Sequence, residues 1–138
     1  MATVVGEILW LRIRFNNNPG DVSAAKHPYV VVQKDEAGLL EIAQLDSLKG
    51  KEYKVAFKSN HLVRCAGQTA LKKDGFVQMD NSFMIDDYEG LSKYSGGTLT
   101  EDLTNDIVKC YQNYQSENEI LENKQVYMSK TEIERLNK

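Results

Sequence analysis

The sequence predicts a mainly β protein with helices at its C-terminal end. Short runs of β-branched and aromatic residues, separated by turn residues, recur over about the first ninety of the 138 positions. Helical spacing of apolar residues begins only after them, near Thr98. A series of about six short strands favours a small closed or half-closed barrel, because closure hides the strand edges.

The first strands are expected in the N-terminal third of the chain. The stretch VVGEILWLRIRF, residues 4–15, is rich in strand formers, and its charged residues indicate one partly solvated face. After the turn residues NNNPGD, the run PYVVVQK from Pro28 is typical of a central strand, in which a proline is tolerated at the first position. The short connection DEAG then predicts a hairpin with LLEIAQL. Trp10, the only tryptophan, is expected in the core rather than as a platform for base stacking.

Shorter strand candidates follow. YKVAF, residues 53–57, alternates weakly, and HLVRC, residues 61–65, is a further candidate. The stretch KKDGFVQMDNSFMID contains a turn signal at Asp74-Gly75 and two apolar pieces separated by Asp80-Asn81-Ser82. These pieces predict one more pair of strands.

Two helices are expected after the strands. Thr98 and Glu101 have capping-box spacing, and the apolar positions that follow predict a helix from Thr100 to about Tyr114. Ser129 and Glu132 have the same spacing and predict a short terminal helix. The polar stretch QSENEILENKQ between them is compatible with a helix, a linker or a partner-binding arm.

The chain length and composition favour one globular domain. Apolar residues make up 41% and charged residues 27% of the sequence, which is ordinary for a soluble protein. We find no signal-peptide pattern and no membrane-span pattern, and we therefore expect a cytoplasmic protein with no membrane partner. The two cysteines, Cys65 and Cys110, lack paired-ligand spacing, so we expect reduced thiols, no metal and no cofactor.

The charge distribution is uneven. Residues 49–73 hold seven basic residues and one acidic residue, although the whole chain has a net charge of −3. Such a block can attract phosphate groups locally. It is equally compatible with a solvated lysine-rich loop.

Several short sequence motifs occur in the order and with the spacing found in a known protein family. They are GEILW from Gly6, PGDVSAAKHPYVVV from Pro19, and FVQMDNSFMIDDYEGLSKYSGGTLTEDLTNDIVKCYQ from Phe76. Over roughly residues 5–114 the chain resembles the PemK/MazF family, the ribonuclease toxins of bacterial toxin–antitoxin pairs. The resemblance implies a barrel domain over residues 1–114, and residues 115–138 form a helical C-terminal extension outside it.

The resemblance implies an SH3-like barrel of the PemK/MazF/CcdB type that forms a homodimer and is inhibited by a cognate antitoxin protein. Single-stranded RNA would bind along a groove of the dimer. The family cleaves RNA without a metal, because the ribose 2′-hydroxyl attacks the adjacent phosphate. That reaction needs a base, an acid and hydrogen-bond donors for the developing charge.

The family's functional positions are changed in this sequence. His27 occupies the position of the arginine in the family's Arg-Pro motif, and Asp46 and Ser47 occupy the positions of its Thr-Ser motif. In the closing strand pair, the family's arginine position is occupied by Gln78, while an aspartate is retained at Asp80. A histidine exchanges protons near neutral pH, but it lacks the permanent bidentate fork of arginine.

We therefore expect a catalytic set in which His27 transfers protons, Asp80 orients or charges it, and Gln78 contributes hydrogen bonds. The alternative for His27 is a partly buried residue bonded to a loop carbonyl. His61 is more simply a turn residue, although it could supply a general acid. The residues expected to contact RNA phosphates are Lys26, Ser47, Lys49 and Lys51.

Three functions are compatible with this sequence. The first is a sequence-selective endoribonuclease toxin, which family precedent favours and which we expect. The second is a catalytically degenerate relative that binds RNA or protein, which the missing arginines favour. The third is a gyrase-poison-like inhibitor that acts through its C-terminal residues.

Overall fold

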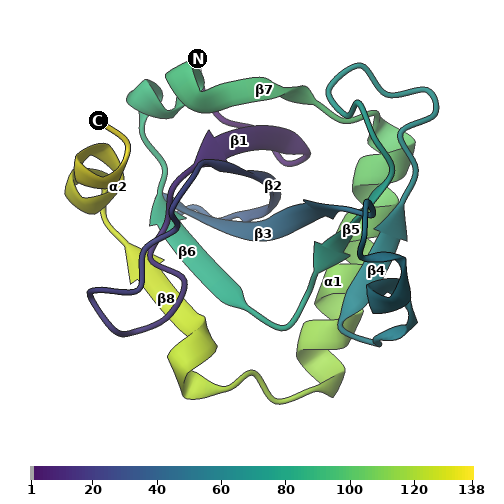
Figure 1. The fold of residues 1–138 in the computed structure, drawn as a ribbon. Helices are drawn as coiled ribbons and strands as arrows, with labels where there is room; N and C mark the ends of the chain where they lie inside the picture. The colour runs from purple at the N-terminus through teal and green to yellow at the C-terminus, as the bar shows by residue number, and fades with distance from the viewer. Residues whose placement is uncertain (1) are drawn as a thin grey trace.

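The computed structural model describes residues 2–138 and shows a mainly β fold (Figure 1), as the sequence predicts. Within these residues, eight strands form one sheet and two α-helices lie in the C-terminal part of the chain. The strands are β1 (Glu7–Leu11), β2 (His27–Lys34), β3 (Leu39–Ser47), β4 (Asn60–Val63), β5 (Gly75–Gln78), β6 (Ser82–Asp86), β7 (Ser95–Thr98) and β8 (Gln125–Met128). The helices are α1 (Glu101–Glu117) and α2 (Lys130–Leu136), with 3₁₀-helices η1 (Glu52–Ala56), η2 (Glu89–Tyr94) and η3 (Glu122–Lys124).

The long strand β3 organises the sheet. One edge of β3 pairs with β2, which confirms the predicted hairpin, and the other edge pairs with β6 in its first half and β5 in its second half. The main path runs β4-β5-β3-β2-β1-β7, and β6 and β8 branch from β3. All pairings are antiparallel except that of β6 with β8. In the described part of the chain β4 and β7 do not pair with each other, so the sheet is open between them.

Strand β2 is buried on both faces, which explains its continuous apolar run. Tyr29 and Val31 point into one hydrophobic cluster, whereas Val30 and Val32 point into the other. This alternation follows from the two-residue period of a strand. The prediction of a central strand at PYVVVQK is therefore confirmed.

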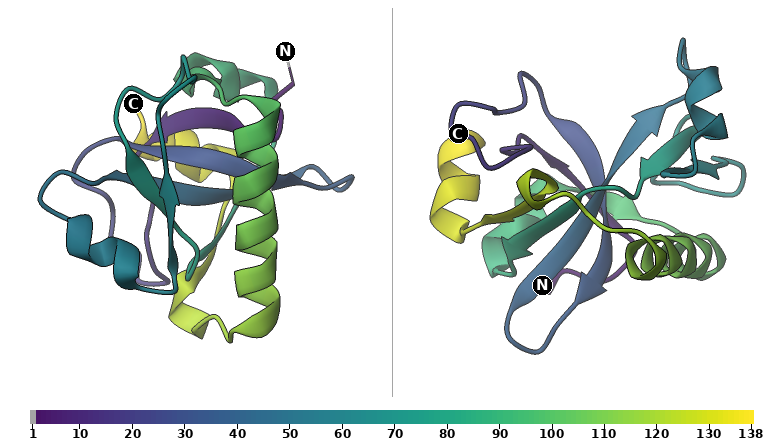
Figure 2. Two further views of the ribbon diagram at one scale, coloured as in Figure 1. Left: turned by 90° about the vertical axis from the view of Figure 1, so that its right-hand side faces the viewer. Right: turned by 90° about the horizontal axis from the view of Figure 1, so that it is seen from below.

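The two clusters lie on opposite sides of the β1-β2-β3 ladder, with α1 covering one side and α2 the other (Figure 2). The α1 cluster consists of Ile8, Val30, Val32, Ala43, Leu45, Val63, Val77, Met79, Leu99, Ile107 and Tyr111. The α2 cluster consists of Leu9, Leu11, Ile13, Tyr29, Val31, Leu40, Ile42, Phe83, Ile85, Leu91, Tyr94, Val126, Met128 and Ile133. The central strands are therefore a scaffold shared by both sides of the molecule.

Both predicted helices form, with one change at the first cap. The N-cap of α1 is Thr100, whose hydroxyl accepts from the Leu103 amide at 3.5 Å, whereas Thr98 belongs to β7. Ser129 caps α2 as predicted, accepting from the Glu132 amide at 3.2 Å. Neither helix, nor any other in residues 2–138, is long and apolar enough to span a bilayer.

The prediction of a strand at YKVAF is wrong. The segment forms the 3₁₀-helix η1, in which every residue remains at least partly exposed. Weak alternation without a buried face gives a strand nothing to pack against. The neighbouring candidate HLVRC is confirmed as β4, where Val63 supplies the buried anchor.

The segment after α1 is more than a helical extension. Strand β8 pairs in parallel with β6, so the polar stretch leads into the sheet. Val126, Met128 and Ile133 are at most 2% exposed and belong to the α2 cluster. Strand β8 and helix α2 therefore contribute buried side chains to the main core.

Candidate functional site

A surface pocket of about 360 Å³ lies where the start of β2, the end of β3 and the loop before β5 meet. We call it the Trp10 pocket. Its polar and aromatic lining consists of Trp10, His27, Asp46, Ser47, Lys72 and Lys73. Apolar lining comes from neighbours such as Ile8, Pro28 and Leu45. The pocket thus combines an apolar surface with cations and one imidazole.

Trp10 is the aromatic group of this pocket, and the prediction that it lies in the core is wrong. Its side chain is 44% exposed, although its neighbours Leu9 and Leu11 are fully buried. The indole lies against the backbone of β7, where a Cβ on Gly96 would come within 2.6 Å of Nε1. The glycine therefore leaves room for the ring. A half-exposed indole in a pocket is available for stacking on a flat ligand.

His27 is the first residue of β2 and lies half-buried in the same pocket. It is in register with Leu11, and the next residue, Pro28, is in register with Trp10. This register brings both residues to the same end of the β1–β2 ladder, with His27 on the sheet face of Leu11 and Trp10 on the opposite face.

Asp46 is the carboxylate that shares the pocket with His27. One of its oxygens accepts from Gln78 Nε2 at 2.8 Å, and the other accepts from Lys51 Nζ at 3.3 Å. Gln78 and Lys51 therefore bind Asp46 rather than standing free for phosphate. Lys51 offsets the negative charge that would otherwise oppose an anion.

Asp80 lies elsewhere. Its carboxylate pairs with Lys124 at 2.7 Å, and it lines a different pocket together with Gln78 and Asn81. The reason is topological: Gly75, at one end of β5, lines the Trp10 pocket, whereas Asp80 follows the other end. Among the described residues, the carboxylate placed with His27 is thus Asp46 and not Asp80.

The expected phosphate-binding residues are only partly brought together. Ser47 lines the pocket, and its hydroxyl accepts from the Lys49 amide at 3.1 Å. The Lys26 ammonium instead lies over the ring of Tyr94, 5.3 Å from its centre. The lysines that line the pocket are Lys72 and Lys73, both exposed. Both lysines belong to the basic block of residues 49–73, which the sequence identifies. The sequence does not show which basic residues of this block face the same pocket.

His61 lies apart from this pocket. It is on β4, and its Nε2 lies 2.7 Å from Oδ2 of Asp106 on α1. It is not among the residues that line the Trp10 pocket. The two histidines therefore occupy separate sites, and His61 is placed to act with α1 rather than with His27.

Comparison with protein families finds no family model that matches the chain, and a search of curated proteins finds no similar sequence. The geometry of the Trp10 pocket indicates which ligands it can bind. An exposed indole can stack on a base, and paired lysines can neutralise phosphates. An imidazole that lines a pocket can exchange protons with a bound ligand.

Proposed function

We propose that this protein binds single-stranded RNA in the Trp10 pocket. The observation that carries the proposal is the half-exposed Trp10 in one pocket with Lys72 and Lys73. Stacking on an aromatic ring contributes about 1–3 kcal/mol per base, and it requires bases that are not paired in a duplex. The lysines supply the salt-dependent attraction to phosphates.

The class we propose is a divergent PemK/MazF-like protein on an SH3-like barrel of the PemK/MazF/CcdB type. Two features support it. The sequence motifs that resemble the family fall on β1, on the start of β2 and on the stretch from β5 to α1. In addition, β3 pairs with both β5 and β6. On this proposal the protein is a cytoplasmic homodimer of toxin type with a cognate antitoxin. The twofold partner would extend the RNA site across the dimer.

A second candidate function adds RNA cleavage at the same site, and the observation that favours it is that His27 and Ser47 line one pocket. The neutral imidazole would take the proton of the ribose 2′-hydroxyl. The 2′-oxygen would attack phosphorus, and the bond to the 5′-oxygen would break. The imidazolium would return its proton to that oxygen, leaving a 2′,3′-cyclic phosphate and a 5′-hydroxyl. Lys72 and Lys73 would stabilise the charge of the phosphorane.

The alternative of a gyrase-poison-like inhibitor is less favoured by the C-terminal geometry. Asn137 is 8% exposed, and its side chain accepts from the Arg12 amide at 2.7 Å and donates to the Arg12 carbonyl at 3.0 Å. A C-terminal residue that is hydrogen-bonded to the rest of the fold in this way is less accessible for binding to a topoisomerase.

RNA binding can be tested by measuring the affinity for a mixed-sequence single-stranded RNA at several salt concentrations. We expect Lys72→Glu/Lys73→Glu to weaken binding and to reduce the salt dependence, whose slope is about 0.7 per neutralised phosphate for single strands. Lys54→Glu/Lys58→Glu is the matched control, because it changes the same charge within the basic block but outside the pocket. Equal losses in both variants would show that the pocket is not the site.

Cleavage is tested separately by incubating the protein with RNA and a chelator and then mapping the ends. Cyclic-phosphate ends that disappear in His27→Ala but persist in Cys65→Ser would support the second candidate. RNA binding without any cleaved product would support RNA binding as the function and would contradict RNA cleavage.

A further inference from the structure

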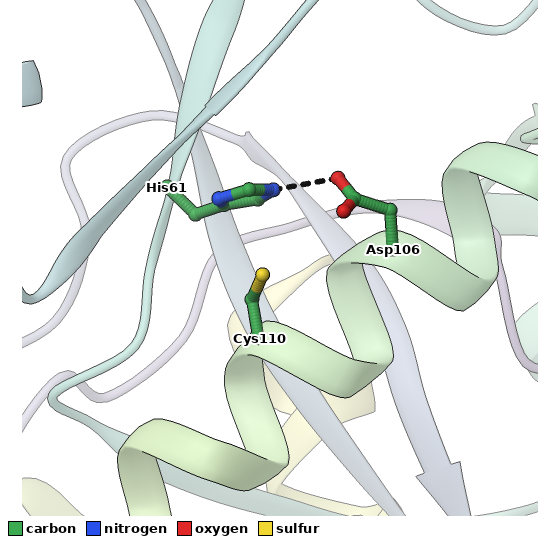
Figure 3. Close-up of side chains that lie close together, drawn as sticks. All are labelled: His61, Asp106 and Cys110. Atoms are coloured by element: carbon green, nitrogen blue, oxygen red, sulfur yellow. Dashed lines mark hydrogen bonds and ion pairs between the residues drawn. The ribbon is translucent and has the colours of Figure 1, made fainter.

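Three side chains with metal-binding atoms converge beside α1, away from the Trp10 pocket (Figure 3). They are His61 from β4 and Asp106 and Cys110 from α1. One ligand atom from each, an imidazole nitrogen, a carboxylate oxygen and the thiol sulfur, lies within 4.8 Å of the other two. Figure 3 shows all three side chains pointing into the space between the strand and the helix.

The local structure explains this convergence. Asp106 and Cys110 are four residues apart, so they lie one above the other on the same face of α1. That face meets β4, a strand at the end of the main path of the sheet. The α1 cluster, which includes Ile107 and Tyr111, fixes the helix against the sheet. The three ligand atoms are therefore held by rigid elements and not by loops.

We propose that His61, Asp106 and Cys110 form a binding site for a divalent transition-metal ion of the Zn²⁺ type. Thiolate and imidazole are ligands that Zn²⁺ and Co²⁺ prefer, whereas Mg²⁺ and Ca²⁺ require mainly oxygen ligands. The set contains a single carboxylate, which excludes the oxygen-rich coordination of the hard cations. Three protein ligands leave one position of a tetrahedral ion open.

The geometry fits such an ion after a small movement. Nitrogen and oxygen ligands of a tetrahedral Zn²⁺ lie about 3.4 Å apart, from bond lengths of about 2.0–2.2 Å. Nε2 of His61 and Oδ2 of Asp106 are 2.7 Å apart, so their hydrogen bond must open. The side chain of Asp106 is 55% exposed and His61 is 24% exposed, which leaves the carboxylate room to move.

The same three residue types could instead form a nucleophilic cysteine site. Such a site needs a thiol that ionises easily. Here burial, followed by the charge of Asp106, raises the pKa of the Cys110 thiol. The geometry also speaks against a catalytic pair, because Nε2 of His61 contacts Asp106, and among the described residues no hydrogen bond joins the imidazole to the Cys110 thiol.

The Asp106 edge of the proposed site faces solvent. Asp106 also lines a surface pocket of about 470 Å³, together with Arg64, Gln68, Thr100 and Asp102. A water molecule or a small anionic ligand entering there can reach the neighbourhood of the ion.

The experiment is a titration of the full chain with Co²⁺ under reducing conditions, without any RNA. We expect one equivalent to bind and to produce a thiolate-to-cobalt charge-transfer band, which excess Zn²⁺ removes by displacement. Cys110→Ser should lose the charge-transfer band, while Cys65→Ser should retain it. His61→Ala and Asp106→Asn should each weaken Co²⁺ binding at least about tenfold.

Far-ultraviolet circular dichroism of each variant separates loss of a ligand from loss of the fold. No Co²⁺ uptake by the folded wild-type chain would overturn the proposal, as would an unchanged charge-transfer band in Cys110→Ser. Rapid alkylation of Cys110 that depends on His61, without Co²⁺ binding, would also overturn it and indicate the nucleophilic site. RNA binding does not enter this test, so the two proposals can fail independently.

Discussion

The two histidines stand in opposite electrostatic surroundings on one scaffold. His27 shares a pocket with Lys72 and Lys73, and the nearby Asp46 is bound by Lys51. His61 instead contacts the carboxylate of Asp106 and lies beside the Cys110 thiol. We propose that the first region binds an anion and the second a cation, and we call them the anion region and the cation region. The fold thus places oppositely charged neighbours around two identical side chains.

The largest expected effect is a loss of stability in variants of the two hydrophobic clusters, only one of which supports the cation region. Ile107→Ala and Ile133→Ala each remove a fully buried side chain, one from the α1 cluster and one from the α2 cluster. We expect each to lower the free energy of unfolding by about 2–5 kcal/mol, measured by urea denaturation. Ile107 lies on α1 between Asp106 and Cys110, so Ile107→Ala should also weaken Co²⁺ binding more than Ile133→Ala does. Equal Co²⁺ affinities in the two variants would show that α1 packing does not position the metal ligands.

A middle-sized effect is expected in the anion region. Gly96→Val introduces a side chain where the Trp10 indole lies, and Gly96 has no positive φ that would itself oppose the substitution. Displacement of the ring should weaken binding of single-stranded RNA about tenfold, which corresponds to the loss of one stacked base. Ser95→Val is the matched control at an exposed neighbouring position of β7. Co²⁺ binding should stay unchanged in both variants, and a loss there would mean that the two regions are coupled.

The smallest effect concerns a carboxylate that belongs to neither region. Hydrogen bonds from Lys93 and then Tyr94 lower the pKa of Glu134 below its ordinary value of 4.5. A lowered folded-state pKa stabilises the protein above the unfolded pKa, and this contribution is lost as the pH falls through the folded pKa. The difference in urea midpoint between wild type and Glu134→Gln should therefore shrink below pH 4.5. A difference that is the same on both sides of this pH would show that the charge of Glu134 is not responsible.

Much of the scaffold is predictable because it depends on local patterns. The run Tyr29–Val32 indicates a strand buried on both faces, and the Ser129 cap marks the start of α2 without tertiary information. YKVAF fails because weak alternation without a buried anchor does not specify a strand. Strand β8 was not predicted, because its pairing with β6 depends on a parallel neighbour far away in the chain.

The candidate sites are less predictable, because they depend on which surfaces meet. Asp80 is near β5 in sequence but lies at the end of that strand remote from Gly75 and the pocket. Trp10 was expected inside, yet Gly96 on β7 gives it a place at the surface. For the cation region, the only sequence signal is the four-residue spacing of Asp106 and Cys110, since His61 is 45 residues from Asp106.

Trp10 also supplies the most direct test of RNA binding, because it is the only tryptophan in the chain and its fluorescence reports on its own surroundings. The measurement is a titration with a short unpaired RNA, followed by the intrinsic fluorescence at low and at moderate salt. We predict saturable quenching that weakens with salt, is reduced in Lys72→Glu/Lys73→Glu, and is much smaller with duplex RNA. Unchanged fluorescence at RNA concentrations where the complex is seen by mobility shift would contradict the account, as would the absence of any complex.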